Sequence, residues 1–261
     1  MSNLALALRD SSTMLRRNLL HARRYPSLTL NLLLTPVMLL VLFVYVFGDA
    51  MSAGIGGGDR SDYIAYIVPG LLLMTIGSTT IGTAVSVAND MTEGIIARFR
   101  TMAIHRGSVL VGHVVGSVVQ SILSVVLVGA VGVAIGFRSA DATALEWLAA
   151  FGLLVLFTLA LTWIAVGMGL VSPNAEAASN NAMPLIFLPL ISSAFVPVDS
   201  MPGWFQPVAE YQPFTPAIET LRGLLLGTGI GHNGWLAVVW SLALTALGYL
   251  WATAKFNNDP K

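Results

Sequence analysis

Long apolar runs separated by short polar stretches dominate the sequence. Six runs are largely free of charged residues, with approximate bounds 28–48, 63–89, 109–137, 145–171, 181–196 and 234–256. A helix needs roughly 20 largely apolar residues to cross the hydrocarbon core of a bilayer. The fifth run is shorter than this and carries Pro184 and Pro189. The pattern predicts an all-α integral membrane protein with six transmembrane helices, the fifth of them irregular.

Composition excludes the main soluble classes. The 261 residues are 56% hydrophobic and only 10% charged, whereas a soluble domain has about 25% charged residues. The net charge of zero provides no basic field for nucleic acid, so no nucleic-acid partner is expected. The chain has no cysteine, and its four histidines lie in separate segments. We therefore expect neither a disulfide framework nor a metal site.

Lysine and arginine predict the orientation in the membrane. With the N-terminus inside, ten basic residues fall on the inner side, namely Arg9, Arg16, Arg17, Arg23, Arg24, Arg98, Arg100, Arg106, Lys255 and Lys261. Three fall outside, namely Arg60, Arg138 and Arg222. Inner loops of membrane proteins are enriched in basic residues. This distribution predicts a multi-pass protein of the cell (plasma) membrane with both termini cytoplasmic.

Residues 1–27 have the pattern of a surface helix. Leu4, Leu8, Leu15 and Leu19 fall on one side of a helix of 3.6 residues per turn, and five arginines fall roughly opposite. Such a basic amphipathic helix would lie in the inner leaflet with its guanidinium groups at lipid phosphates. The same arginines also serve as a topology signal, and the sequence leaves both interpretations open.

The charged loop between the second and third runs, residues 90–108, predicts a short amphipathic helix. Ile95, Phe99 and Met102 share one helical face, and we expect the Gly107–Ser108 pair to end that helix before the third span. The partner of this face is lipid or another protein, and periodicity does not decide between them. The second inner loop, 172–180, is expected to be a bare connection.

The outer segment 197–230 contains five prolines, which exclude one long helix. Its aromatic residues are typical of a membrane interface. Thr215 and Pro216 resemble an N-cap followed by a proline at the first helical position, and Gly227 is expected to end the helix. We predict broken half-helices that re-enter the outer leaflet. The alternative is an external loop lying on the lipid headgroups.

The chain lacks an ATP site of its own. A Walker A loop needs Gly-Lys-Ser/Thr, but Lys255 follows Ala254 and Lys261 follows Pro260. No pair of ionisable residues is predicted within the spans; His113 is the single candidate, and its role stays open. Sodium coupling through backbone carbonyls also stays open. The sequence thus predicts no enzyme, but a transporter whose energy comes from another chain.

Two motifs resemble the ABC type-2 permease family, particularly its daunorubicin-resistance branch of drug exporters. In the loop, the family pattern is matched by Asp90, Gly94, Arg98, Phe99, Arg100 and Arg106. In the outer segment, it is matched by Phe195, Pro197, Met201, Pro202, Trp204, Pro213, Thr215, Pro216 and Gly227. One residue departs from the pattern: Ala103 stands where the family usually has proline.

The resemblance implies the permease subunit of an ABC exporter. A second permease copy (a homodimer) or a paralogous permease would pair with it, and separate nucleotide-binding ATPase subunits would hold ATP and Mg, with no cofactor in this chain. The loop would be the coupling helix, contacting the ATPase through Asp90, Glu93, Gly94, Ile95, Arg98, Phe99, Arg100, Met102 and Arg106. The outer re-entrant segment would place Pro202, Trp204, Phe205, Tyr211, Phe214 and Pro216 at the exit.

The apolar, uncharged spans suit an amphipathic or lipophilic cargo, such as a drug, an antibiotic or a lipid. The alternatives are a glycan or polyketide-like lipid cargo on the same machinery, and a stand-alone secondary transporter. The predicted substrate path consists of Thr75, Ser78, Thr79, Phe187, Ser192, Ser193 and Phe195. Ordinary helix packing and interhelical hydrogen bonds are the alternative role for each of these residues.

Overall fold

The computed structural model describes residues 26–46, 48, 60–93, 106–139 and 141–258. Throughout these ranges the regular structure is helical, and no strand occurs in them. The predicted interfacial helix 1–27 lies almost entirely outside the described residues, as does the loop 94–105. The all-α prediction therefore holds for the part of the chain that is described.

Among the described residues, four helices are long and apolar enough to cross a membrane. They are α4 (Arg60–Thr92), α6 (Arg106–Ile135), α7 (Ala144–Val171) and α12 (Asn233–Asn258). They match the second, third, fourth and sixth predicted spans. The first predicted span corresponds to α2 (Pro26–Tyr45), whose described apolar part, Leu34–Tyr45, is shorter. The structure thus provides four membrane-span candidates, against the six predicted.

The fifth apolar run is not a continuous helix. It contains the seven-residue helix α9 (Pro184–Leu190), which is followed by turns at 191–195. Before it comes α8 (Ala175–Ala182), where only a bare connection was expected. The Asn174 side chain starts α8 by accepting a hydrogen bond from the Ala177 N–H at 2.8 Å. Much of the segment 172–180, which was expected to be a bare connection, is therefore helical.

The helix ends next to the inner loop also differ from the prediction. Helix α4 continues through Asp90 to Thr92, and α6 begins at Arg106 and runs through Gly107 and Ser108. The expected break at Gly107–Ser108 is therefore absent. A glycine inside a helix costs only about 1 kcal/mol relative to alanine, which a helix of 30 residues with an apolar sequence tolerates.

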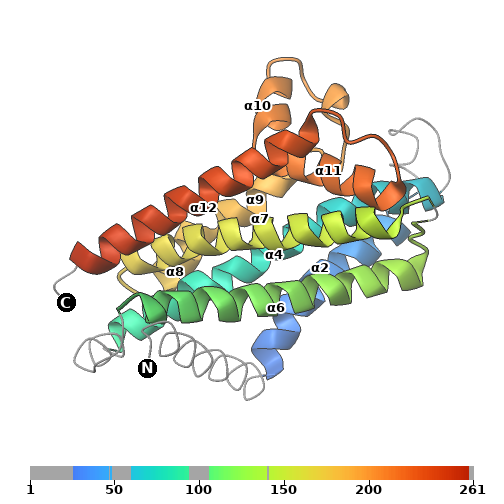
Figure 1. Cartoon of the computed structure of the whole chain (residues 1–261). Helices are drawn as coiled ribbons and strands as arrows, with labels where there is room; N and C mark the ends of the chain where they lie inside the picture. Colours follow the sequence, from blue (N-terminus) through green and yellow to red (C-terminus); the bar gives the residue numbers. More distant parts are fainter. Residues whose placement is uncertain (1–25, 47, 49–59, 94–105, 140, 259–261) are drawn as a thin grey trace.

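The long helices form a bundle in which α4 and α7 lie inside (Figure 1). Helix α4 packs against α6, α7, α8 and α11, and most of its residues are buried. By contrast, α6 and α12 carry many exposed apolar side chains, including Leu123, Val126, Leu242 and Leu250. Exposed apolar side chains on a long helix are stable where lipid rather than water surrounds them.

Glycines bring neighbouring helices into close contact. A side chain at Gly248 of α12 would meet the backbone of Trp163 in α7 at 2.8 Å, and one at Gly167 of α7 would meet the ring of Trp251 in α12. Gly77 of α4 lies directly against the Leu185 carbonyl of α9. Small residues at such contacts are the usual means by which membrane helices approach each other.

The two ends of the bundle contain different helix ends and short helices. One end, to the left in Figure 1, gathers Thr92, Arg106, Val171 and Asn258, which are the ends of α4, α7 and α12 and the start of α6. A separate apolar cluster fills this end: Val87, Leu110, Val114, Trp163, Val166, Leu170, Ala252 and Phe256. The opposite end carries α10 (Gln206–Tyr211) and α11 (Phe214–Leu226).

Candidate functional site

An ion pair joins α4 to α6 at the end of the bundle that the sequence predicts to be cytoplasmic. The Nε2 atom of His113 lies 3.0 Å from Oδ2 of Asp90, and both side chains are only 7% exposed. Asp90 was predicted to belong to the docking loop; it lies instead in the last turn of α4 and is buried. No ionisable pair was predicted within the spans, and the role of His113 was left open; the contact with Asp90 was not foreseen, since sequence spacing does not show which turns of two helices face each other.

The other predicted coupling residues are only partly described. Glu93 follows the last residue of α4 and is exposed, and Arg106 is the first residue of α6. Six more lie outside the described residues: Gly94, Ile95, Arg98, Phe99, Arg100 and Met102. The end of α4 at Thr92 and the start of α6 at Arg106 lie at the same end of the bundle.

At the opposite end, the proline-rich segment forms three short helices in the described structure. They are the 3₁₀ turn η2 (Val198–Ser200), α10 and α11. Trp204 and Tyr211 are exposed, whereas Phe214 and Pro216 are buried. Pro202 is exposed, and the ring of Phe205 packs edge-on against Trp204 at 5.4 Å between centroids. The aromatic residues of this segment thus divide between its surface and its core.

The start of α11 differs from the prediction, and its end agrees with it. The helix begins at Phe214 after Pro213, so Thr215 is not its N-cap. The Thr215 hydroxyl instead donates to the Ala209 carbonyl and accepts from the Ser193 N–H at 3.2 Å. Gly227 ends the helix in the left-handed conformation with φ of 66°, which glycine adopts without steric strain.

Arg222 of α11 is a buried cation that sequence reasoning did not single out. Its Nε and Nη2 donate to the Tyr66 carbonyl of α4, at 3.2 and 3.1 Å, and Nη2 also donates to the Ser193 carbonyl at 2.9 Å. Nη1 pairs with Glu219 at 2.5 Å, and the guanidinium lies 3.8 Å from the Tyr66 ring centroid. A signal was present: Ile218, Arg222 and Leu225 follow helical spacing, so an arginine interrupts the apolar stripe.

The residues of the predicted substrate path lie mainly at helix contacts. The Thr75 and Ser78 hydroxyls donate to carbonyls of their own helix, and Thr79 bonds Ser121 of α6 at 2.7 Å. Ser192 and Ser193 are buried in the turn after α9, the Phe195 ring lies 4.6 Å from that of Phe43, and Phe187 is exposed. Their assignment to a transport path stays a prediction.

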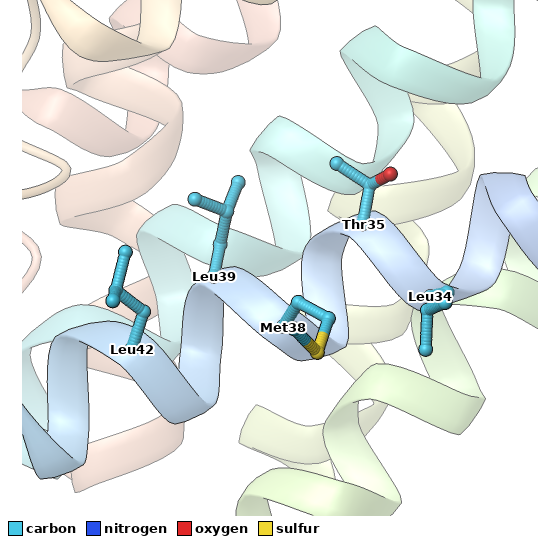
Figure 2. A pocket seen from close by; sticks show the side chains of 5 residues that line it. All are labelled: Leu34, Thr35, Met38, Leu39 and Leu42. Carbon is cyan, nitrogen blue, oxygen red and sulfur yellow. The ribbon is translucent and has the colours of Figure 1, made fainter.

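The cavity drawn in Figure 2 lies elsewhere, on α2. It has a volume of about 290 Å³ and is lined by Leu34, Thr35, Met38, Leu39 and Leu42. These five side chains come from successive turns of one helix, and Leu34 and Met38 are exposed. None of the seven predicted path residues lines this cavity. Within the described ranges, moreover, no three His, Cys, Asp or Glu side chains gather as a metal site would require.

Comparison with known proteins assigns this helical bundle to a family. The model of the ABC-2 type transporter family matches residues 10–226, most of the chain. The chain belongs to the ABC-2 type transporter family. It is therefore a membrane-embedded permease, and in this family ATP is hydrolysed by a separate subunit. The resemblance stated from two motifs is confirmed over a much longer part of the sequence.

Named relatives connect this ABC-2 permease to drug resistance. The chain is 28% identical, over 86% of its length and 77% of the relative's, to the daunorubicin resistance permease DrrB1 of Streptomyces coeruleorubidus. It is 24% identical to the probable doxorubicin resistance permease DrrC of Mycobacterium tuberculosis, over 74% of this chain and 68% of the relative. Nodulation protein J of Rhizobium meliloti is 24% identical over 73% of both chains.

Proposed function

We propose that this ABC-2 permease forms the membrane pathway of an exporter that moves an amphipathic or lipophilic cargo, a drug or a lipid, out of the cell. The observation that carries the proposal is the family match over residues 10–226, together with likeness to two permeases named for drug resistance. The apolar bundle supports such a cargo, since its candidate spans carry few charges. The absence of a Walker A sequence supports a separate ATPase subunit with its ATP and Mg.

The complete transporter contains two permeases, as a homodimer or with a paralogue, and two ATPase subunits. The permease lies in the plasma membrane with both termini cytoplasmic, supported by the ten-to-three distribution of basic residues. Helix α2 forms the first of six spans. Helices α8 and α9 with the turns that follow form a broken fifth span, and η2, α10 and α11 form the re-entrant outer segment. The basic helix 1–27 lies on the inner leaflet.

The loop 90–108 docks on the ATPase and acts as the coupling helix. Support comes from its apolar face, Ile95, Phe99 and Met102, and from the basic residues beside it. Closure of the ATPase on ATP displaces this loop, and the attached helices α4 and α6 follow as rigid bodies. The role of Asp90 changes in this proposal: it does not contact the ATPase but ties the end of α4 to α6 through His113.

The first prediction concerns coupling between ATP hydrolysis and export. In the complete transporter in lipid vesicles, amphipathic drugs or lipids should stimulate ATP hydrolysis and be transported. Phe99→Ala and Arg98→Glu should abolish the stimulation or weaken assembly, because they remove an apolar anchor and reverse a charge in the docking face. Hydrolysis and transport are measured with a panel of drugs, lipids and glycans, and assembly by co-purification of the ATPase.

Charge reversal of the exposed Arg138, at the other end of the bundle, is the matched control and should leave both measurements unchanged. Normal transport and co-purification in both loop variants would refute the coupling role. If only glycans stimulated hydrolysis, the cargo would be a sugar chain rather than a drug or a lipid. Transport by the permease without its ATPase, driven by an ion gradient, would favour a secondary transporter.

A further inference from the structure

The described part of the chain buries two formally charged side chains, Asp90 at one end of the bundle and Arg222 at the other. A charge removed from water is unfavourable unless hydrogen bonds and a counter-charge replace its hydration. Arg222 has both, and its partners come from three segments: α4, the turn after α9 and α11 itself. The contacts of Arg222 show which of these three segments it holds together.

Helix α11 holds the main chain of Ser193 from two sides. Thr215 accepts from the Ser193 N–H, while Arg222 donates to the Ser193 carbonyl, which also accepts from the Tyr66 hydroxyl at 2.9 Å. The turn itself rests on α4, since a side chain at Gly70 would lie 2.8 Å from the Ala194 backbone. The turn and α4 therefore form one surface, and Arg222 fastens α11 to it.

The counter-charge of Arg222 lies on its own helix. Glu219 is one turn earlier in α11 and is partly exposed, so the two residues remain together wherever α11 moves. The bonds to Tyr66 and Ser193, by contrast, join α11 to other segments and break on separation. The arrangement here keeps the cation paired in both a joined and a separated state.

We propose that Arg222 is a positioning residue that latches α11 to α4 and the turn at 191–196 while the outer end is closed, and releases it when cargo leaves. This inference rests on the proposed function, which places α11 at the exit. Hydrogen bonds suit such a latch because they are lost steeply with distance and angle. The guanidinium fork engages two backbone carbonyls at once, which the single ammonium of lysine does not reproduce.

The chain has no cysteine, so one introduced thiol reports opening. Ala217 of α11 is fully buried, and Ala217→Cys provides a site that a membrane-impermeant maleimide reaches only when α11 separates. The labelling rate is measured in the complete transporter in lipid vesicles, with and without ATP and Mg. Arg222→Lys, Glu219→Gln and the control Thr220→Val are compared in this background; Thr220 is buried but bonds only the Pro216 carbonyl of its own helix.

Two effects of different size are expected. Arg222→Lys should raise the labelling rate without nucleotide by about tenfold, since it loses at least one charged hydrogen bond across the contact. Glu219→Gln keeps the Arg222 bonds across the contact and should raise that rate much less, because the buried cation loses only a counter-charge that is itself partly exposed. Thr220→Val should label like the parent. If Arg222→Lys does not accumulate, Thr215→Val removes the α11 acceptor of the Ser193 N–H across the same contact and should give a smaller increase.

Labelling of Arg222→Lys at the parent rate would overturn the latch, as would an equal rise without nucleotide in Arg222→Lys and Glu219→Gln, which is the signature of general loosening. These failures are separable from failure of the proposed function. If the parent shows cargo-stimulated hydrolysis but the variants do not shift labelling, only the latch is wrong. If no cargo stimulates hydrolysis, the export proposal fails, and the nucleotide-free rates still report whether Arg222 closes the contact.

Discussion

At the scale of single residues, the buried pair of Asp90 and His113 illustrates why position matters more than residue type. Asp90 and His113 are 23 positions apart in the sequence, and each has an ordinary explanation as a residue near a span end. Their side chains meet only because the last turn of α4 and the second turn of α6 lie side by side. Because both side chains are buried, removing one of them should be more damaging than removing an exposed charge.

The prediction at this scale concerns stability. Asp90→Ala leaves His113 buried without its acidic partner and should destabilise the permease by about 1–3 kcal/mol. Asp90→Asn keeps an acceptor for the His113 N–H and should be milder. Resistance of the purified protein to denaturant in detergent measures both. Asp141 is exposed, and Asp141→Ala serves as the control. Equal stability of all three variants would show that the contact between Asp90 and His113 does not stabilise the permease.

At the scale of elements, the apolar runs predicted the long helices well because twenty apolar residues in sequence leave few alternatives to a membrane helix. Short elements were predicted less well. Helix α8 depends on an Asn174 cap, and the start of α11 depends on where Thr215 finds partners. Both choices are decided by contacts worth roughly 1 kcal/mol, which a local sequence pattern does not determine.

The packing of α7 against α12 leads to the prediction for this scale. Gly248→Ala places a methyl group 2.8 Å from the Trp163 backbone and should destabilise the bundle by about 1–3 kcal/mol through overpacking. Gly152→Ala, on α7 but with open space around it, should be neutral or slightly stabilising, since alanine favours the helix. Thermal unfolding in detergent compares the two. Equal unfolding temperatures would mean that the close contact does not constrain α12.

At the scale of the whole molecule, the order of the helices places the ion pair and Arg222 at opposite ends. Alternate helices run in opposite directions, so the Asp90 end also collects the ends of α7 and α12. The charge distribution predicts that this end is cytoplasmic. The two polar sites would then serve opposite sides of the membrane, one beside the ATPase and one at the exit.

The prediction at this scale is topological. In the cysteine-free chain, Glu176→Cys lies at the start of α8 and Trp204→Cys lies before α10, and both positions are exposed. A membrane-impermeant thiol reagent added to intact cells should label Trp204→Cys and reach Glu176→Cys only after the cells are opened. The reverse pattern would invert the orientation and place the latch on the cytoplasmic side.

The sequence by itself determined the class of protein, the four long membrane-span candidates, the family and the end of α11 at Gly227. These follow from properties that a linear pattern contains: apolar length, the absence of a phosphate-binding loop, local motifs and the conformational freedom of glycine. Tertiary structure alone decided that Asp90 pairs with His113 and that Arg222 holds Tyr66 and Ser193. Those contacts join residues up to 156 positions apart, and they depend on which helix faces meet when the bundle buries its apolar surface, a choice that no single segment contains.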